Sequence, residues 1–182
     1  MTPEPELHRP TATDRISPAG MKIEVVADRD EMSAIAGRLV VPEVRGFTAR
    51  FALSRPLAGN TAKREGEIIA EGWLRAVLLR ECVISMELFE EIVEQPFRVR
   101  FVPAGTEADD PDPEADDEIG YEGAAIDLGE AAVEQLALIM DPYPRKPGAV
   151  LPPEASDPEE GPFAALRGMS RREGRGRDEN DG

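Results

Sequence analysis

The segment from Glu67 to Cys82 constrains the fold most, because it has the length of a long strand and carries apolar residues at both alternating positions. Trp73 and Val77 occupy one set of positions, and Leu74 and Leu78 occupy the other. A strand that is apolar on both faces is typical of the centre of a sheet or of a strongly curved sheet. The segment therefore predicts a central or strongly curved strand.

Strand-type alternation occurs in three further stretches, residues 22–27, 47–54 and 86–102, and a short strand is expected near Tyr121. Pro96 lies inside the third stretch, which predicts a sheet edge or a bulge there because proline has no N–H for the ladder. Strands that follow one another in the chain favour antiparallel pairing, with helices covering one face or one end.

Two helices are predicted from their N-caps and apolar stripes. Asp28 caps the first, with Glu31 three residues later as in a capping box. Asp127 and Glu130 stand in the same relation at the second helix, and Pro142 predicts its end near Asp141. The expected buried stripes are Met32, Ile35, Ala36 and Leu39 in the first helix, and Leu128, Ala132, Val133, Leu136, Ile139 and Met140 in the second.

These elements predict an α+β fold. We expect a single domain over residues 16–144, with a curved, mainly antiparallel sheet of about five strands and two main helices. Residues 1–15 are expected to form a disordered N-terminal arm, and residues 145–182 a mostly disordered tail with a short apolar island at 161–169. Proline and scattered charge in these ends leave too little apolar surface to offset the entropy of ordering.

Half of the net charge of −16 lies in one predicted loop. Residues 104–120 contain many carboxylates and no lysine or arginine. Such a block is typical of a solvated insertion, and a decoy for basic partners is the alternative interpretation. A calcium-binding loop starting at Asp110 fits poorly, because Ala115 and Tyr121 occupy the positions of the required glycine and glutamate.

The sequence indicates no enzyme, no cofactor and no metal site. The single histidine, His8, falls in the expected N-terminal arm, and the single cysteine, Cys82, reads as a half-buried small hydrophobe. Nucleophile-elbow, phosphate-loop and zinc-helix motifs do not occur. Without a secretory signal or an apolar run of membrane length, we expect a cytoplasmic protein with no membrane partner and no small-molecule substrate.

Basic character of possible functional interest occurs in two places. Arg98 and Arg100 share one face of a predicted strand, and a group of arginines marks the C-terminal tail. The tail resembles a short Arg-Gly segment that contacts RNA backbone, although neighbouring carboxylates nearly cancel its charge.

Four motifs in order carry a resemblance to a known family. The sequence Glu81-Cys82-Val83-Ile84-Ser85-Met86-Glu87 follows the long strand and leads to Pro96–Phe101. An acidic insertion, the helix from Ile126 to Pro144 and the Gly161–Leu166 segment come next. This order resembles the YceD family, the bacterial large ribosomal RNA subunit accumulation proteins, over residues 70–169.

The resemblance implies a non-enzymatic factor that supports synthesis, processing or stability of large-subunit (23S) ribosomal RNA. Its implied partner is a ribosomal protein or a pre-ribosomal particle, since members are often encoded beside a small zinc-ribbon ribosomal protein. Many members carry Cys-x-x-Cys after the long strand; here Ser85 replaces the second cysteine, so no thiol metal site carries over.

Besides a purely structural interaction module that uses the helix from Asp127 to Met140, three readings of function stay open. The first is a ribosome-assembly factor, for which the candidate partner-binding residues are Arg98, Arg100, Tyr143, Phe163 and Leu166. An acidic chaperone for a basic ribosomal protein without RNA contact is a second mechanism. The third is a carboxylate- and metal-dependent nuclease using Asp127 and Glu130, although both residues also read as helix caps.

Overall fold

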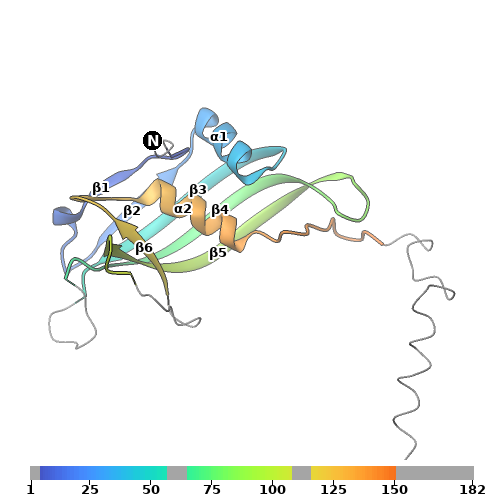
Figure 1. Cartoon of the computed structure of the whole chain (residues 1–182). Coiled ribbons are helices and arrows are strands. Elements are labelled where there is room, and N and C mark those ends of the chain that lie inside the picture. The colour runs from blue at the N-terminus through green and yellow to red at the C-terminus, as the bar shows by residue number, and fades with distance from the viewer. Residues whose placement is uncertain (1–4, 57–64, 108–115, 151–182) are drawn as a thin grey trace, which may run out of the picture. The chain divides into compact units, whose positions relative to one another are not determined.

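The computed structural model describes residues 5–56, 65–107 and 116–150 (Figure 1). The chain divides into two units, Met1–Lys146 and Pro147–Gly182, and every described helix and strand lies in the first. This unit contains a five-stranded sheet, a small two-stranded sheet and two α-helices. The predicted α+β class is therefore confirmed.

The main sheet has the order β2-β3-β4-β5-β6. Its strands are β2 (Met21–Val26), β3 (Glu43–Ser54), β4 (Ile68–Glu81), β5 (Leu88–Pro103) and β6 (Asp117–Tyr121). All neighbours pair antiparallel except β5 and β6, which are parallel. The long segment at residues 67–82 is the central strand, as its apolar pattern predicts.

Pro96 lies at an open edge of the sheet. It stands opposite Trp73 in an unbroken β4–β5 register. Strand β6 pairs only with Val99–Pro103, so no described strand lies beside Pro96 on the other side. The edge predicted from this proline is present, and it runs from Leu88 to Arg98.

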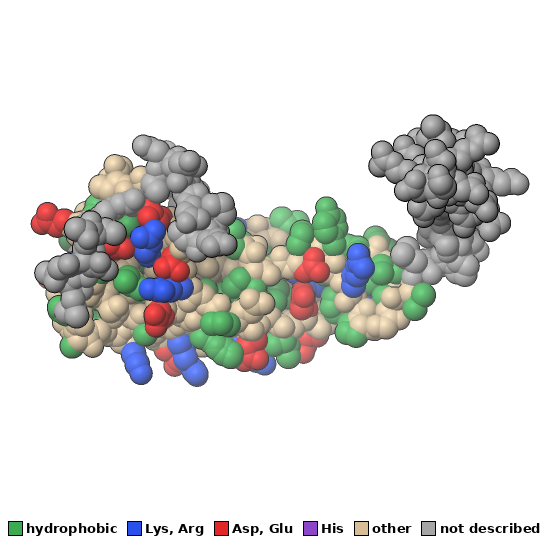
Figure 2. All heavy atoms as spheres, turned by 90° about the horizontal axis from the view of Figure 1, so that it is seen from below, with side chains coloured by type: hydrophobic (Ala, Val, Ile, Leu, Met, Phe, Trp, Pro, Cys, Tyr) green, Lys and Arg blue, Asp and Glu red, His purple; other side chains and the backbone are tan. Residues whose placement is uncertain are grey.

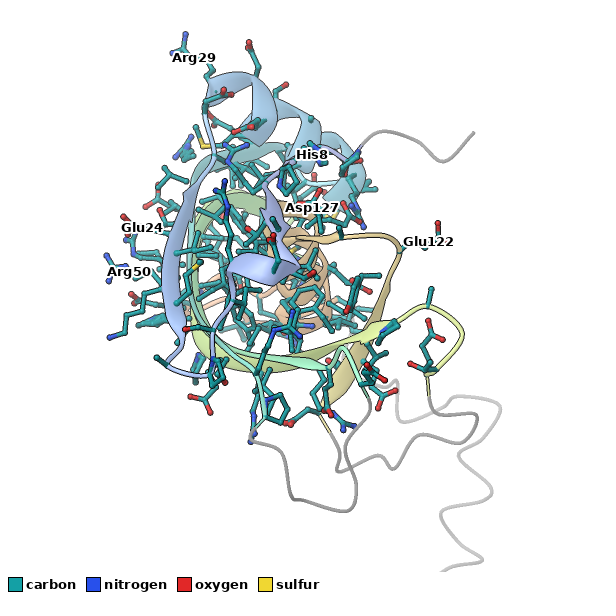
Figure 3. All side chains as sticks on the ribbon, turned by 90° about the vertical axis from the view of Figure 1, so that its left-hand side faces the viewer. His8, Glu24, Arg29, Arg50, Glu122 and Asp127 are labelled. Atoms are coloured by element: carbon teal, nitrogen blue, oxygen red, sulfur yellow. The ribbon has the colours of Figure 1, made fainter. Side chains whose placement is uncertain are left out.

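The core lies between the inner face of the sheet and helix α2 (Leu128–Ile139). Seen from one end in Figure 3, the sheet curls around α2, while α1 (Arg29–Leu39) lies above it. The buried residues of α2 include Leu128, Ala132, Val133 and Leu136 of the predicted stripe, while Ile139 and Met140 are half-buried.

The helix termini follow the predicted caps with one difference. Asp28 accepts a bond from the Glu31 amide, and the Glu31 carboxylate accepts one from the Asp28 amide, so the first capping box is complete. Asp127 accepts bonds from the amides of Gly129 and Glu130. The Glu130 carboxylate instead accepts 2.7 and 2.9 Å bonds from Arg38 of α1, which ties the two helices together.

The prediction of a disordered arm at residues 1–15 is wrong for residues 5–15, which the structure places in the fold. Strand β1 (Pro10–Ala12) pairs antiparallel with β7 (Ala125–Asp127), and a 3-10 turn follows at Thr13–Arg15. Leu7 is completely buried in the core. Its backbone passes so close to α2 that a Cβ on Gly129 would lie 2.2 Å from the Leu7 carbonyl oxygen.

Polar contacts fix the same segment at both sides. His8 contacts Asp127, and the Arg9 guanidinium donates 2.7 and 2.8 Å bonds to the two oxygens of Glu31. The arm was misjudged because a single buried leucine and two specific ion contacts leave no periodic pattern in a proline-rich segment.

We predict that Leu7→Ala lowers the free energy of unfolding by about 2–5 kcal/mol, because it leaves a cavity in a packed core. Urea denaturation followed by circular dichroism measures the change. The matched control Leu138→Ala removes the same atoms from an exposed site on α2 and should stay within about 0.5 kcal/mol of wild type. Equal effects of the two substitutions would show that Leu7 is not part of the core.

Candidate functional site

The outer face of the main sheet, which is the face turned away from α2, carries a groove. Side chains alternate between faces, so Trp73 points outward from the central strand and is 39% exposed. Its register partners are Arg50 on β3 and Pro96 on β5. A large apolar ring therefore stands in the open at the middle of the sheet.

The groove has a volume of about 890 Å³. Its lining includes Trp73 and Pro96 together with charged side chains from β2, β3 and β4, namely Lys22, Glu24, Arg50 and Glu71. Beneath it, the rings of Phe51 and Phe97 pack edge to face with centroids 5.3 Å apart. Gly72 makes room for this pair, because a Cβ there would lie 2.1 Å from the Phe97 ring.

Charges on the outer face are arranged as ion pairs across neighbouring strands. Arg50 donates a 2.8 Å bond to Glu24, and Figure 3 shows both side chains pointing out from the sheet. Arg75 lies 3.7 Å from Glu94. Exposed pairs of this kind contribute little to stability, so both partners remain available to an incoming molecule.

The structure separates the two arginines predicted to bind a partner. Both lie on the outer face of β5, as the sequence indicates. Arg98 is half exposed and only loosely paired, 3.3 Å from Asp116. Arg100 is held by Glu67 and Glu118 at 3.4 and 2.7 Å, and both of those carboxylates are nearly buried. Arg98 is thus available for contact, whereas Arg100 fastens β6 to the sheet.

Tyr143 is exposed but lies far from Arg98. It follows α2 in a turn where its amide donates a 2.8 Å bond to Asp141. The adjoining Pro144 accepts a bond from the Val83 amide, beyond the end of β4, while Arg98 stands opposite Glu71 near the other end of that strand. At the rise of a β-strand these places are about 30 Å apart. Phe163 and Leu166 lie outside the described residues.

A second groove of about 610 Å³ lies beside this turn. Pro142 and Pro144 line it together with Val40 and Val83, and Arg80 and Glu81 contribute its polar groups. Val40 is the left-handed C-cap of α1 and Met86 has a positive φ in the β4–β5 turn. β-Branched valine rarely adopts such a φ, so local strain coincides with this groove.

Cys82 is the first residue of the β4–β5 turn. Its side chain is completely buried, and its sulfur accepts bonds from the Ile84 and Ser85 amides at 3.4 and 3.5 Å. The hydrogen bond from the Ser85 side chain, helped by these amides, lowers the pKa of Cys82 to about 7. The thiol is more buried than the sequence suggested, and this burial separates it from solvent reagents.

The carboxylates considered for nuclease chemistry are engaged within the fold. Asp127 caps α2 and also accepts a bond from the Arg9 amide, and Glu130 binds Arg38. Among the described residues no group of three or more histidine, cysteine, aspartate or glutamate side chains is placed to hold a metal ion. No helix in the same residues has the length and hydropathy to cross a membrane.

The family model for the large ribosomal RNA subunit accumulation protein YceD matches residues 70–168. This match covers more than half of the chain, so the protein belongs to the YceD family. The family places it broadly in ribosome biogenesis, and the resemblance seen in the sequence is confirmed. Neither a curated protein nor a solved structure matches the chain.

Sequence reasoning found Arg98 but missed the groove around Trp73. Trp73 occupies an ordinary alternating position in its strand. Because both faces of this strand are apolar, the sequence does not say which face a helix covers. The available signal was in the neighbouring strand, where Phe47, Phe51 and Leu53 occupy alternating positions and therefore share one face. Helix α2 packs on that face.

We predict that Ser85→Ala raises the pKa of Cys82 above about 7, because the thiolate loses a hydrogen-bond donor. Thiolate absorbance near 240 nm, followed against pH, measures it. Since the native pKa is depressed, the thiolate adds stability above the unfolded pKa, and this contribution is lost as pH falls through about 7. An unchanged titration in Ser85→Ala would contradict the assignment.

Proposed function

We propose that this protein supports the accumulation of 23S ribosomal RNA by binding, without catalysing a reaction. In this proposal it holds a ribosomal protein of the large subunit, free or in a pre-ribosomal particle, on the outer face of its sheet. The matched family region runs from Ala70 to Gly168 and includes most of β4 and all of β5, β6 and α2. The observation that carries the proposal is the exposed groove around Trp73, whose β4 and β5 side lies in this region and whose other side comes from β2 and β3.

The charge of the chain favours a protein partner over bare RNA. A net charge of −16 repels phosphates at long range and attracts basic proteins. The outer face offers an exposed aromatic ring beside carboxylates such as Glu24 and Glu71. Lysine and arginine side chains of a partner can pack on the tryptophan ring and pair with these carboxylates. We place this binding in the cytoplasm, where ribosomal subunits are assembled.

An acidic chaperone for a basic ribosomal protein is one form of the proposed binding mechanism. A factor that holds a basic ribosomal protein before it joins RNA needs no RNA contact of its own. The paired charges of the outer face suit this role. A basic side chain of the partner can replace Arg50 or Arg98 in its ion pair with a carboxylate, and no buried charge is then left unpaired.

Affinity isolation of the tagged full-length protein from growing cells tests the proposal. We expect a basic large-subunit protein to be recovered, and recovery to survive RNase. Trp73→Ala should reduce recovery about tenfold, because buried tryptophans dominate binding energy at interfaces. The exposed control Leu138→Ala, on the other side of the sheet, should recover as much as wild type.

Two results would overturn the proposal in different ways. Recovery of no large-subunit component would remove the role in assembly through binding. Recovery that disappears after RNase treatment would replace the protein partner with RNA.

A further inference from the structure

Within the part of the chain that the structure describes, β5 from Leu88 to Gln95 is a strand edge beside which no further strand is paired. Among the described residues, β5 pairs with β4 along its whole length on one side, but with β6 only from Val99 to Pro103 on the other. The remaining edge would span about 25 Å at the rise of a strand. Such an edge presents a row of N–H and C=O groups that can pair with a further strand.

The hydrogen-bond pattern shows which residues face this opening. Cys82 donates its amide hydrogen to the carbonyl of Glu87, so Glu87 and the odd-numbered residues after it turn their backbone groups toward β4. Pro96 agrees with this, because its nitrogen has no hydrogen to give to β4. The even-numbered residues Leu88, Glu90, Ile92 and Glu94 therefore direct their N–H and C=O groups to the open edge.

The side chains of these four residues form a row on the outer face beside the edge. All four are exposed, and the row alternates apolar and acidic groups: Leu88, Glu90, Ile92, Glu94. The cations that contact Glu90 and Glu94 are Arg45 and Arg75, which come from strands further inside the sheet. From Leu88 to Glu94 the outward-facing side chains of β5 are acidic or apolar. Figure 2 shows acidic, basic and hydrophobic side chains interspersed over the face of the unit seen from below.

We propose that this edge binds an extended, basic polypeptide segment as an additional strand. Cross-strand pairing requires side chains of matching chemistry opposite each residue. The partner strand would place apolar groups opposite Leu88 and Ile92, and lysine or arginine opposite Glu90 and Glu94. Its outward-facing positions therefore alternate cationic and apolar residues. The backbone bonds supply affinity and this alternation supplies specificity.

Other occupants fit the edge less well. A second copy of this chain would bring Glu90 and Glu94 close to the same carboxylates, which repel each other. A nucleic acid strand would place phosphates beside the acidic row in the field of a chain with net charge −16. Asp116 and Asp117, at the beginning of β6, extend the acidic surface at the far end of the edge.

This inference rests on the proposed function, because it names the form of the protein partner that the outer face receives. Pro96 borders both the edge and the groove around Trp73. A basic segment paired with β5 therefore lies next to that groove, where following residues of the same partner can reach the tryptophan.

A fluorescein-labelled peptide with the repeat Lys-Thr-Val-Thr, three times over, tests the edge by fluorescence anisotropy with the full-length protein. We expect saturable binding. The same peptide with alternate amides N-methylated keeps every charge but loses the strand-pairing donors on one side. It should bind about tenfold more weakly or worse if pairing with β5 supplies the affinity. Equal binding of the two peptides would overturn strand addition.

The double substitution Glu90→Lys with Glu94→Lys reverses the charge of the row. It should weaken binding of the unmethylated peptide about tenfold or more. The control double substitution Glu122→Lys with Glu134→Lys changes the net charge equally at two exposed residues outside β5, and should bind within about twofold of wild type. Equal losses in both variants would show a general charge effect and overturn the proposal. Circular dichroism confirms folding, and the N-methyl comparison on wild type does not depend on either variant.

The remaining occupants are outcomes of the same experiments. A wild-type dimer in sedimentation that dissociates with Ile92→Arg would assign the edge to a second copy. A labelled single-stranded RNA that binds wild type but not Ile92→Asp would assign it to nucleic acid. Either result overturns the proposal.

Affinity isolation separates this proposal from the proposed function. If the edge variant recovers as much large-subunit protein as wild type, strand addition at β5 is wrong while the binding function stands. If wild type recovers none, the function fails, and peptide binding still reports on the edge.

Discussion

The burial of the apolar stripe of α2 inside the curled main sheet is the constraint on which the structure depends. Leu128, Ala132 and Leu136 pack against inward-facing residues of the sheet and have no exposed surface. The sheet curves strongly around this one helix, so that α2 covers its inner face. The outer face is left to solvent, although the central strand carries Trp73, Val77 and Leu79 there. Apolar residues on an uncovered sheet face are typical of an interaction surface.

Strand β5 is divided into a part with a structural role and an exposed part that is proposed to bind a partner. Before Pro96 the strand is an open edge with an acidic and apolar row, and after Arg98 it is covered by β6. Arg100 belongs to the covered part, where Glu67 and Glu118 neutralise it, and Arg98 belongs to the exposed part. Two arginines of similar sequence character thus have different roles, because the next strand along the chain, β6, pairs beside only one of them.

Local patterns allowed much of the fold to be predicted. The strands, the helix caps at Asp28 and Asp127 and the edge at Pro96 depend on neighbours within a few residues or on the chemistry of one residue. The contacts of the N-terminal segment could not be predicted in this way. Leu7 meets Gly129, and Arg9 meets Glu31, across separations that carry no periodic signal. The prediction of a second capping box was wrong for the same reason, because the carboxylate of Glu130 accepts a hydrogen bond from Arg38 of α1.

The sequence by itself determined the class of fold, the central place of residues 67–82 and the family, because alternation, caps and motif order are properties of the chain read in one direction. Tertiary structure alone decided which face of β4 the helix covers, which arginine stays exposed and that residues 5–15 complete the core. These outcomes depend on the packing of segments far apart in sequence. A long-range contact is favoured by the surface that both partners bury together, and neither segment carries that information alone.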